Sequence, residues 1–226
     1  MAFIAGVDEA GRGPVLGPLV ICAFACREGE EKTLRELGAK DSKALQPPAR
    51  EKAAAKLKGY PHSMVEISAE EITEAMRSKV SLNELEARKA ADALAKLQRK
   101  LGAEKLATVF IDSPDPNPRK FEQRIKKYWH KLRLPAGAAV IAENHADSKY
   151  AVVGAASVMA KSLREKRVGE LHKEFGFFGS GYPSDERTME FLRRHVGDGR
   201  LKRHIRWEWS TLNKISKIDV RLSDFT

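Results

Sequence analysis

The fold of this chain is decided by the stretch Ile4-Ala5-Gly6-Val7-Asp8-Glu9-Ala10-Gly11-Arg12-Gly13-Pro14. Within it an apolar strand ends at two adjacent carboxylates, and a glycine-rich turn follows. Its apolar residues predict a short strand at residues 2–8, and the run Val15 to Cys26 predicts a second buried strand. Packing gives no reason for an acidic pair at the end of a buried strand. We therefore expect Asp8 and Glu9 to belong to a functional site.

Apolar periodicity further along the chain predicts an alternation of helices and strands. Helical spacing is found at residues 30–37, 48–58, 70–79, 82–100, 121–132 and 152–172. Short apolar runs predict strands at residues 64–67, 106–111 and 138–142. Such alternation is typical of an α/β core. After about residue 175 the chain turns to helix and loop, so we expect its C-terminal part to pack as an appendage.

The composition predicts a soluble, globular protein of the cytoplasm. Of the 226 residues, 42% are apolar and 32% are charged, which supplies a core and excludes general disorder. The longest apolar stretch, residues 14–25, is broken by Pro and Gly and is too short to span a membrane. No basic residue precedes Asp8, so a signal peptide is not expected. Cys22 and Cys26 share one strand, where a disulfide is geometrically poor, and two thiols make no zinc site.

The charge balance favours a polyanionic partner. Forty-one Lys and Arg residues against 31 Asp and Glu residues leave a net charge of +10. The basic residues concentrate in residues 119–133, 161–173 and 193–206. A clustered basic face gains affinity for phosphates by releasing counterions. The alternative, a basic surface that serves only solubility, stays open on charge alone.

Two further carboxylates lie at the ends of predicted elements. Asp112 closes the strand at residues 106–111, and Asp147 precedes the last long helix. Taken alone, Asp112 fits an ordinary turn and Asp147 an ordinary N-cap. Together with Asp8 and Glu9 they form a set of acids that repel each other unless a divalent cation neutralises them. Oxygen ligands at that density suit Mg²⁺ or Mn²⁺, and two such ions form a clamp for in-line displacement at phosphorus.

Asp8 and Glu9 are adjacent on one strand, and adjacent residues of a regular strand face opposite sides. Either the strand breaks at this pair, or one of the two contributes a backbone carbonyl. The acidic set and the basic surface together predict a metal-dependent nuclease.

An ordered set of short motifs resembles the type 2 ribonucleases H, the ribonuclease HII family. Its blocks are Gly6-Val7-Asp8-Glu9-Ala10-Gly11-Arg12-Gly13-Pro14, Asp41-Ser42-Lys43, Ile111-Asp112-Ser113, Ala146-Asp147-Ser148-Lys149-Tyr150, Ala155-Ala156-Ser157, Ala160-Lys161 and Gly179-Ser180-Gly181-Tyr182-Pro183-Ser184-Asp185. The blocks follow the family's order and cover roughly residues 4–212. The motif Arg206-Trp207-Glu208-Trp209-Ser210-Thr211 resembles the archaeal and eukaryotic branch more than the bacterial one.

The resemblance implies a ribonuclease H-like fold, with a mixed five-stranded sheet flanked by helices and a C-terminal helical extension. We expect a catalytic domain at residues 1–175, a helical region packed on it at residues 176–217 and a tail at residues 218–226. The implied activity is endonucleolytic cleavage of the RNA strand of RNA–DNA hybrids and of single ribonucleotides embedded in duplex DNA, with roles in replication and ribonucleotide repair. We expect two-metal hydrolysis that leaves 5′-phosphate and 3′-hydroxyl ends.

The resemblance also assigns roles to particular residues. The metal-binding and catalytic acids fall on Asp8, Glu9, Asp112 and Asp147. The substrate-binding residues fall on Gly11, Arg12, Gly13 and Tyr182, and Lys43, Ser157 and Lys161 are expected to contact phosphates. Glycines allow a close main-chain approach to the 2′-hydroxyl, and the arginine fork suits a phosphate. Each assignment has an alternative. The glycines would form a simple turn, the tyrosine would cover the core, and the lysines would lie on a solvated face.

Three departures from the family pattern leave the four acids untouched. The segment Glu143-Asn144-His145-Ala146-Asp147 replaces the commoner Glu-His-Lys-Ala-Asp, Ala151 stands where Pro is usual, and Glu165 where Asp is usual. They leave the rate and the preference between Mg²⁺ and Mn²⁺ open. A nucleic-acid-binding subunit without catalysis would need one acid replaced. A transposase, integrase or Holliday-junction nuclease would lack the Gly-Arg-Gly turn and the Gly-Tyr-Pro-Ser-Asp block.

The chain's other expected associations concern its assembly and its tail. A single working chain, a monomer, is favoured over the catalytic subunit of a heterotrimer. The tail, residues 219–226, resembles the peptide by which replication proteins dock on the sliding clamp. Leu222 and Phe225, three positions apart, would share one face of a helical turn as anchors for an apolar groove. The match is partial, because Asp219 stands in place of the usual Gln and Thr226 in place of the second aromatic residue. The alternative is a tail that folds back on the C-terminal helices.

Overall fold

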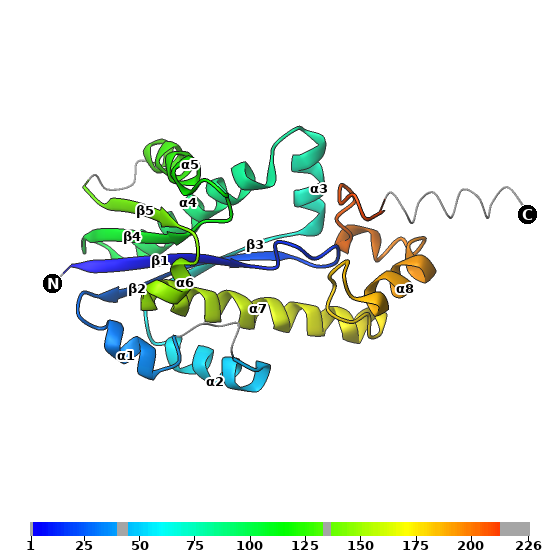
Figure 1. Cartoon of the computed structure of the whole chain (residues 1–226), viewed down its shortest axis with the longest axis horizontal. Coiled ribbons are helices and arrows are strands. Elements are labelled where there is room, and N and C mark those ends of the chain that lie inside the picture. The colour runs from blue at the N-terminus through cyan, green and yellow to red at the C-terminus, as the bar shows by residue number, and fades with distance from the viewer. Residues whose placement is uncertain (1, 40–44, 133–136, 213–226) are drawn as a thin grey trace, which may run out of the picture. The chain divides into compact units, whose positions relative to one another are not determined.

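The computed structural model describes residues 2–39, 45–132 and 137–212. Its elements in chain order are β1 (Phe3–Ala10), β2 (Leu19–Arg27), α1 (Glu31–Glu36), α2 (Pro47–Leu57), β3 (His62–Ile67), α3 (Ala69–Arg77), α4 (Leu82–Leu101), β4 (Leu106–Asp112), α5 (Pro118–Lys131), β5 (Ala139–Glu143), α6 (Ala146–Lys149), α7 (Ala151–Phe175), α8 (Glu186–His195) and the 3₁₀ turn η1 (Lys202–His204), as Figure 1 shows. No helix in these ranges is long and apolar enough to cross a membrane.

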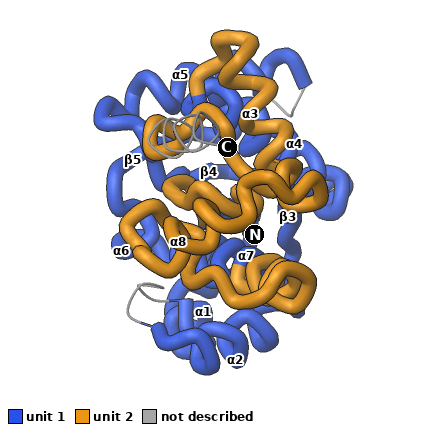
Figure 2. The backbone as a smooth tube through the Cα atoms, turned by 90° about the vertical axis from the view of Figure 1, so that its right-hand side faces the viewer, with its two compact units in different colours: residues 1–10, 20–66, 82–164 blue, residues 11–19, 67–81, 165–226 orange. Residues whose placement is uncertain are grey.

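The chain forms two compact units, each built from three separate segments (Figure 2). Unit 1 comprises Met1–Ala10, Val20–Glu66 and Leu82–Arg164, and unit 2 comprises Gly11–Leu19, Ile67–Ser81 and Glu165–Thr226. The helix α7 passes from one to the other, because its residues 151–164 belong to unit 1 and its residues 165–175 to unit 2. The division expected at residues 175 and 217 stays a prediction.

Unit 1 carries a mixed five-stranded sheet in the order β3-β2-β1-β4-β5, which confirms the predicted α/β fold. The strand β1 runs antiparallel to β2 and parallel to β4, and β4 runs parallel to β5. The register of β1 and β4 places Val7 beside Ile111. Their next residues, Asp8 and Asp112, therefore come to the same edge of the sheet.

The sheet of unit 1 is covered on both faces, with α4 and α5 on one side and the first part of α7 on the other (Figure 1). This explains why β2 is buried along nearly its whole length and reads as a continuous apolar run. Gly6 allows α7 to lie directly against β1, because a Cβ at Gly6 would come within 2.4 Å of the backbone of Val152. The start of α7 is correspondingly rich in small and apolar residues, and residues 151–160 are all buried.

Two sequence expectations about the first hairpin are corrected. The second strand begins at Leu19 and not at Val15, because Gly17 takes a left-handed φ of 86° and Pro18 has no N–H for the ladder. Leu16 instead forms an isolated antiparallel bridge with Ile205 inside unit 2. The first strand, predicted at residues 2–8, continues to Ala10, so of the two alternatives for Asp8 and Glu9 the strand break does not occur.

Unit 2 has a core of its own. Val15 and Leu16 pack with Phe178 and with Leu192 of α8, and all four side chains are buried.

In unit 1, Cys22 and Cys26 lie buried as free thiols, and burial raises the pKa of Cys26 to about 12. These thiols therefore pack as small apolar side chains.

Candidate active site

Three carboxylates converge at one edge of the sheet in unit 1. One oxygen each of Asp8, Asp112 and Asp147 lies within 4.8 Å of the others. Asp8 comes from β1, Asp112 ends β4, and Asp147 lies in the short helix α6. Asp8 and Asp147 are buried and Asp112 is half-buried, so the group has little access to screening water.

Local hydrogen bonds fix the orientation of these carboxylates. The Ala146 N–H donates to Oδ1 of Asp112 at 2.8 Å, which ties the start of α6 to the end of β4 and so places Asp147. His145 makes the sharp turn between these elements in a left-handed conformation with φ 59°. The Glu9 N–H donates to Oδ1 of Asp8 at 2.7 Å, and the Ser157 side chain also hydrogen-bonds to Asp8.

The electrostatics of the group favour a bound cation. Burial raises the pKa of Asp8 well above its usual value, and the neighbouring charges of Glu9 and Asp112 raise it further. Oxygen ligands of one Mg²⁺ at about 2.1 Å stand roughly 3–4 Å from each other, so a separation of up to 4.8 Å needs only a small closure to bind an ion. The donor set contains only oxygens, which suits Mg²⁺ or Mn²⁺.

Glu9 lies outside this group of three, because β1 stays regular and adjacent side chains of a strand face opposite ways. It nevertheless lines the same small cavity of about 10 Å³ as Asp8 and Asp112. That volume corresponds to about one water molecule. Glu9 is thus close to the carboxylate group but lies on the other face of the strand.

Sequence reasoning missed Glu86, which lines this cavity from α4 and is only 1% exposed. Leu85, Glu86 and Ala90 all belong to the buried face of α4. A carboxylate at a position where the helical period calls for an apolar residue is the signal that could have found it.

The residues expected to contact phosphate fall in different environments. Ser157 is fully buried, so its observed partner is Asp8. Lys161 lies one helical turn further along α7 and is half-buried. Lys43 lies outside the described residues. The phosphate contacts of all three stay predictions.

The Gly-Arg-Gly turn belongs to unit 2, where a buried arginine holds it. Arg206 is 0% exposed, and its guanidinium donates to the carbonyl oxygens of Gly11 at 2.6 Å, Arg12 at 2.9 Å and Gly17 at 3.0 Å. Trp209 donates from its indole N–H to the Gly13 carbonyl at 3.1 Å, and the Arg206 guanidinium stands 5.1 Å from its ring centroid. The sequence had marked these two residues only as part of a branch-specific motif.

Tyr182 packs beside this turn within unit 2. A Cβ at Gly13 would lie 3.2 Å from the Tyr182 ring, so glycine makes room for the tyrosine. The Val15 N–H donates to the Gly181 carbonyl at 2.8 Å and links the two loops. The ring remains 38% exposed. Gly13, Tyr182 and Arg206 therefore belong to one structural group, although they lie far apart in the sequence.

Known proteins resemble this chain over nearly its whole length. The family model described as ribonuclease HII matches residues 5–212. The ribonuclease HII of Thermofilum pendens is 39% identical over 223 residues, covering 95% of this chain and 100% of that protein.

Solved structures give the same picture. The ribonuclease H2 of Pyrococcus horikoshii OT3 superposes with a TM-score of 0.82 at 40% identity, covering 95% of this chain and 97% of that one. The ribonuclease HII in a complex with PCNA from Archaeoglobus fulgidus superposes with a TM-score of 0.77 at 36% identity, covering 93% of this chain and 95% of that one. A Bst-RNase HIII in complex with Mn²⁺ shares the fold with a TM-score of 0.79 at 20% identity, covering 97% of this chain and 71% of that one.

Proposed function

Because the chain belongs to the ribonuclease HII family and is a type 2 ribonuclease H that acts on RNA–DNA hybrids, we propose that it also cuts duplex DNA at single embedded ribonucleotides and uses two divalent ions. The observation that supports the chemistry most is the convergence of Asp8, Asp112 and Asp147 to within 4.8 Å. The expected products carry 5′-phosphate and 3′-hydroxyl ends.

Asp8, Asp112 and Asp147, with Glu9 beside them, would hold Mg²⁺ or Mn²⁺. When bound, the ions supply positive charge against the scissile phosphate and acidify a water molecule for attack. Ser157 and the Glu9 N–H orient the Asp8 carboxylate, and the Ala146 N–H orients that of Asp112. Ligand directions fixed by such bonds spare the site a reorganisation during the reaction.

Recognition of the ribonucleotide is proposed for the Gly-Arg-Gly turn and Tyr182. Arg206 and Trp209 already donate hydrogen bonds to the carbonyls of Gly11, Arg12 and Gly13. The N–H groups of this turn are therefore the main-chain groups that we propose to contact a 2′-hydroxyl. The half-exposed Tyr182 ring, packed on Gly13, offers a flat apolar surface for a sugar at the RNA–DNA junction. Lys43, Ser157 and Lys161 are proposed phosphate contacts.

We also propose that the chain works as a monomer in the cytoplasm, in replication and ribonucleotide repair. The Archaeoglobus fulgidus relative was solved with PCNA, which supports a clamp contact for the tail residues Leu222 and Phe225. Both residues lie outside the described part of the chain.

The deciding experiment is cleavage of a DNA duplex that carries one ribonucleotide, with Mg²⁺, with Mn²⁺ and with EDTA. We expect cleavage with either ion, none with EDTA, and losses of several orders of magnitude for Asp112→Asn. Asp92→Asn, in the same unit but not among the residues that line the cavity, is the matched control and should keep full activity. Unchanged cleavage by Asp112→Asn at saturating Mg²⁺ would contradict the assignment.

Tyr182→Ala should lower cleavage of the single-ribonucleotide duplex more than cleavage of a long hybrid, and equal losses would make Tyr182 a packing residue.

A further inference from the structure

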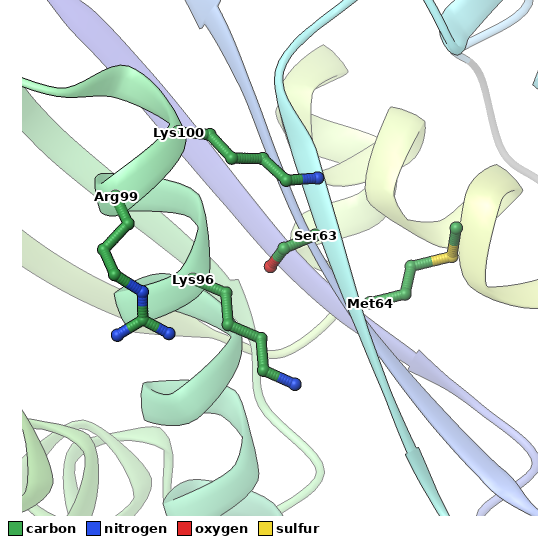
Figure 3. Close-up of a pocket in the computed structure, with 5 residues that line it drawn as sticks. All are labelled: Ser63, Met64, Lys96, Arg99 and Lys100. Atoms are coloured by element: carbon green, nitrogen blue, oxygen red, sulfur yellow. The ribbon is translucent and has the colours of Figure 1, made fainter.

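A basic pocket in unit 1 lies beside the edge strand β3 and shares no lining residue with the carboxylate site. Its volume is about 390 Å³, and Ser63 and Met64 of β3 line it together with Lys96, Arg99 and Lys100 of α4 (Figure 3). We call it the edge pocket. Nothing in the cleavage chemistry described above uses it.

The lining of the edge pocket is positively charged without an internal counterion. Three of its five residues are cations and none is a carboxylate. Some other basic residues of unit 1 are paired, such as Arg27 with Glu104 at 3.3 Å. Within the described ranges, Lys96, Arg99 and Lys100 form no salt bridge with an acid. An anion from outside the chain would therefore complete the pocket.

Two polar groups of the edge pocket, those of Lys100 and Ser63, are held in place by hydrogen bonds. Figure 3 shows the side chains of Lys96 and Lys100 reaching from α4 toward β3 on either side of Ser63. Lys100 donates from Nζ to the His62 carbonyl at 2.6 Å, and Ser63 donates from its hydroxyl to the Ala93 carbonyl at 2.6 Å. These bonds clamp the strand to the helix, so an arriving ligand orders fewer side chains.

The main chain of β3 adds a donor to the edge pocket. The Pro61 carbonyl accepts a hydrogen bond from the Ala25 N–H of β2, so it points toward the neighbouring strand. The next carbonyl, that of His62, accepts from Lys100 and points to the open edge of the sheet. Main-chain groups alternate along a strand, which directs the Met64 N–H to the open edge as well. The Met64 side chain points to the other face of the sheet in Figure 3, consistent with a main-chain contribution.

Two ordinary explanations account for only part of this arrangement. Cations in the last turn of a helix offset its dipole, which suits Arg99 and Lys100, but Lys96 lies a turn earlier. The dipole end carries about half a negative charge, which three cations outweigh. A lysine also protects an open sheet edge from pairing, which suits Lys100 alone.

We propose that the edge pocket binds backbone phosphates of a nucleic acid outside the cleavage site. Ammonium, guanidinium and amide donors match phosphate oxygens, and the lining has no aromatic ring on which a base could stack. The contact is therefore independent of base sequence. An added peptide strand fits less well, because Lys100 already occupies the His62 carbonyl that such a strand would need. The choice of nucleic acid as ligand rests on the proposed function.

The test measures binding of a long, ribonucleotide-free DNA duplex to the full-length chain in EDTA, by fluorescence anisotropy over a series of salt concentrations. The variant Lys96→Gln/Arg99→Gln removes two cations and leaves the Lys100 bond intact. Lys52→Gln/Lys56→Gln, on exposed positions of α2, is the matched control. We expect the log–log salt slope to flatten by up to about 1.8 for the first variant and by less than about 0.5 for the control.

The same variant should raise KM for a long hybrid while kcat stays unchanged. Equal slopes for the edge-pocket variant and the control would overturn the proposal. So would a variant that loses affinity for poly-glutamate or inorganic phosphate but binds DNA as before. Because binding is measured without divalent ions and without a cleavable bond, a failure of the proposed nuclease activity would not change this result.

Discussion

The replacement Arg206→Met tests the view that one buried arginine shapes the Gly-Arg-Gly turn. Methionine has a similar length but no donor, so the carbonyls of Gly11 and Gly17, both bonded in buried positions, lose their partner. An unsatisfied buried acceptor costs about 1–3 kcal/mol, which gives roughly 2–6 kcal/mol for the two. Water can replace the bond to Arg12, which is only partly buried. This destabilisation is smaller than the roughly 10 kcal/mol in the middle of the usual range of domain stability, so we expect the variant to be folded at 25 °C.

Urea unfolding measures the stability of Arg206→Met, and cleavage of a single-ribonucleotide duplex measures the effect on the turn. A displaced turn should lower kcat/KM by about 100-fold, since a shift of about 1 Å in a positioning group has an effect of that size. Arg203→Met, on an exposed position of the same segment, should change the free energy of unfolding by less than about 0.5 kcal/mol. Arg206→Lys should recover part of both losses, because the lysine ammonium keeps the charge and can donate hydrogen bonds from one nitrogen, although it lacks the planar fork of the guanidinium.

The reasoning is refuted if Arg206→Met unfolds within about 0.5 kcal/mol of the parent chain and cleaves at the parent rate. It is also refuted if the variant loses stability but cleaves the single-ribonucleotide duplex and the long hybrid at unchanged rates. That second result would make Arg206 a purely structural residue.

Three further predictions address the packing of α7 and the charges of unit 1. Gly6→Ala should lower the free energy of unfolding by about 3 kcal/mol or more, because its Cβ would overlap the backbone of α7. Gly169→Ala, at a position of α7 with open space around it, should raise the free energy of unfolding by about 0.5–1 kcal/mol. Thermal unfolding of both variants checks this. Hydrogen bonds from the Asn117 N–H and, next, from Arg124 lower the pKa of Asp115 to about 2. The ionised carboxylate should therefore add about 1–2 kcal/mol to the free energy of unfolding above pH 4, and this contribution should be lost as the pH falls through about 2. In urea unfolding measured over this pH range, Asp115→Asn should lack that loss. Asp8→Asn should raise the melting temperature in EDTA, because it removes a buried charge whose pKa is raised, and should reduce the stabilisation by added Mg²⁺; a lower melting temperature in EDTA would contradict this.

Local patterns predicted most of the fold and part of the site. Strand and helix positions followed from periodicity, and the carboxylates Asp8, Asp112 and Asp147 were identifiable because each ends or precedes an apolar element where packing needs no charge. The structure brings these three together, since β1 and β4 are parallel and their C-terminal ends share one edge. Glu9 followed from its neighbour Asp8, yet its face of the strand depended on whether β1 stayed regular.

The sequence by itself determined the α/β class, the order of the elements and the position of each acid at the end or start of its own element, because these depend on residues that are neighbours along the chain. Only the tertiary structure decided the support of the Gly-Arg-Gly turn, because Arg206 and the carbonyls it binds are separated by 189 to 195 residues. It also decided that the second strand starts at Leu19, since Leu16 pairs with Ile205. A local pattern records which residues prefer to be buried, whereas the partner that satisfies a buried carbonyl or guanidinium depends on segments that meet only after folding.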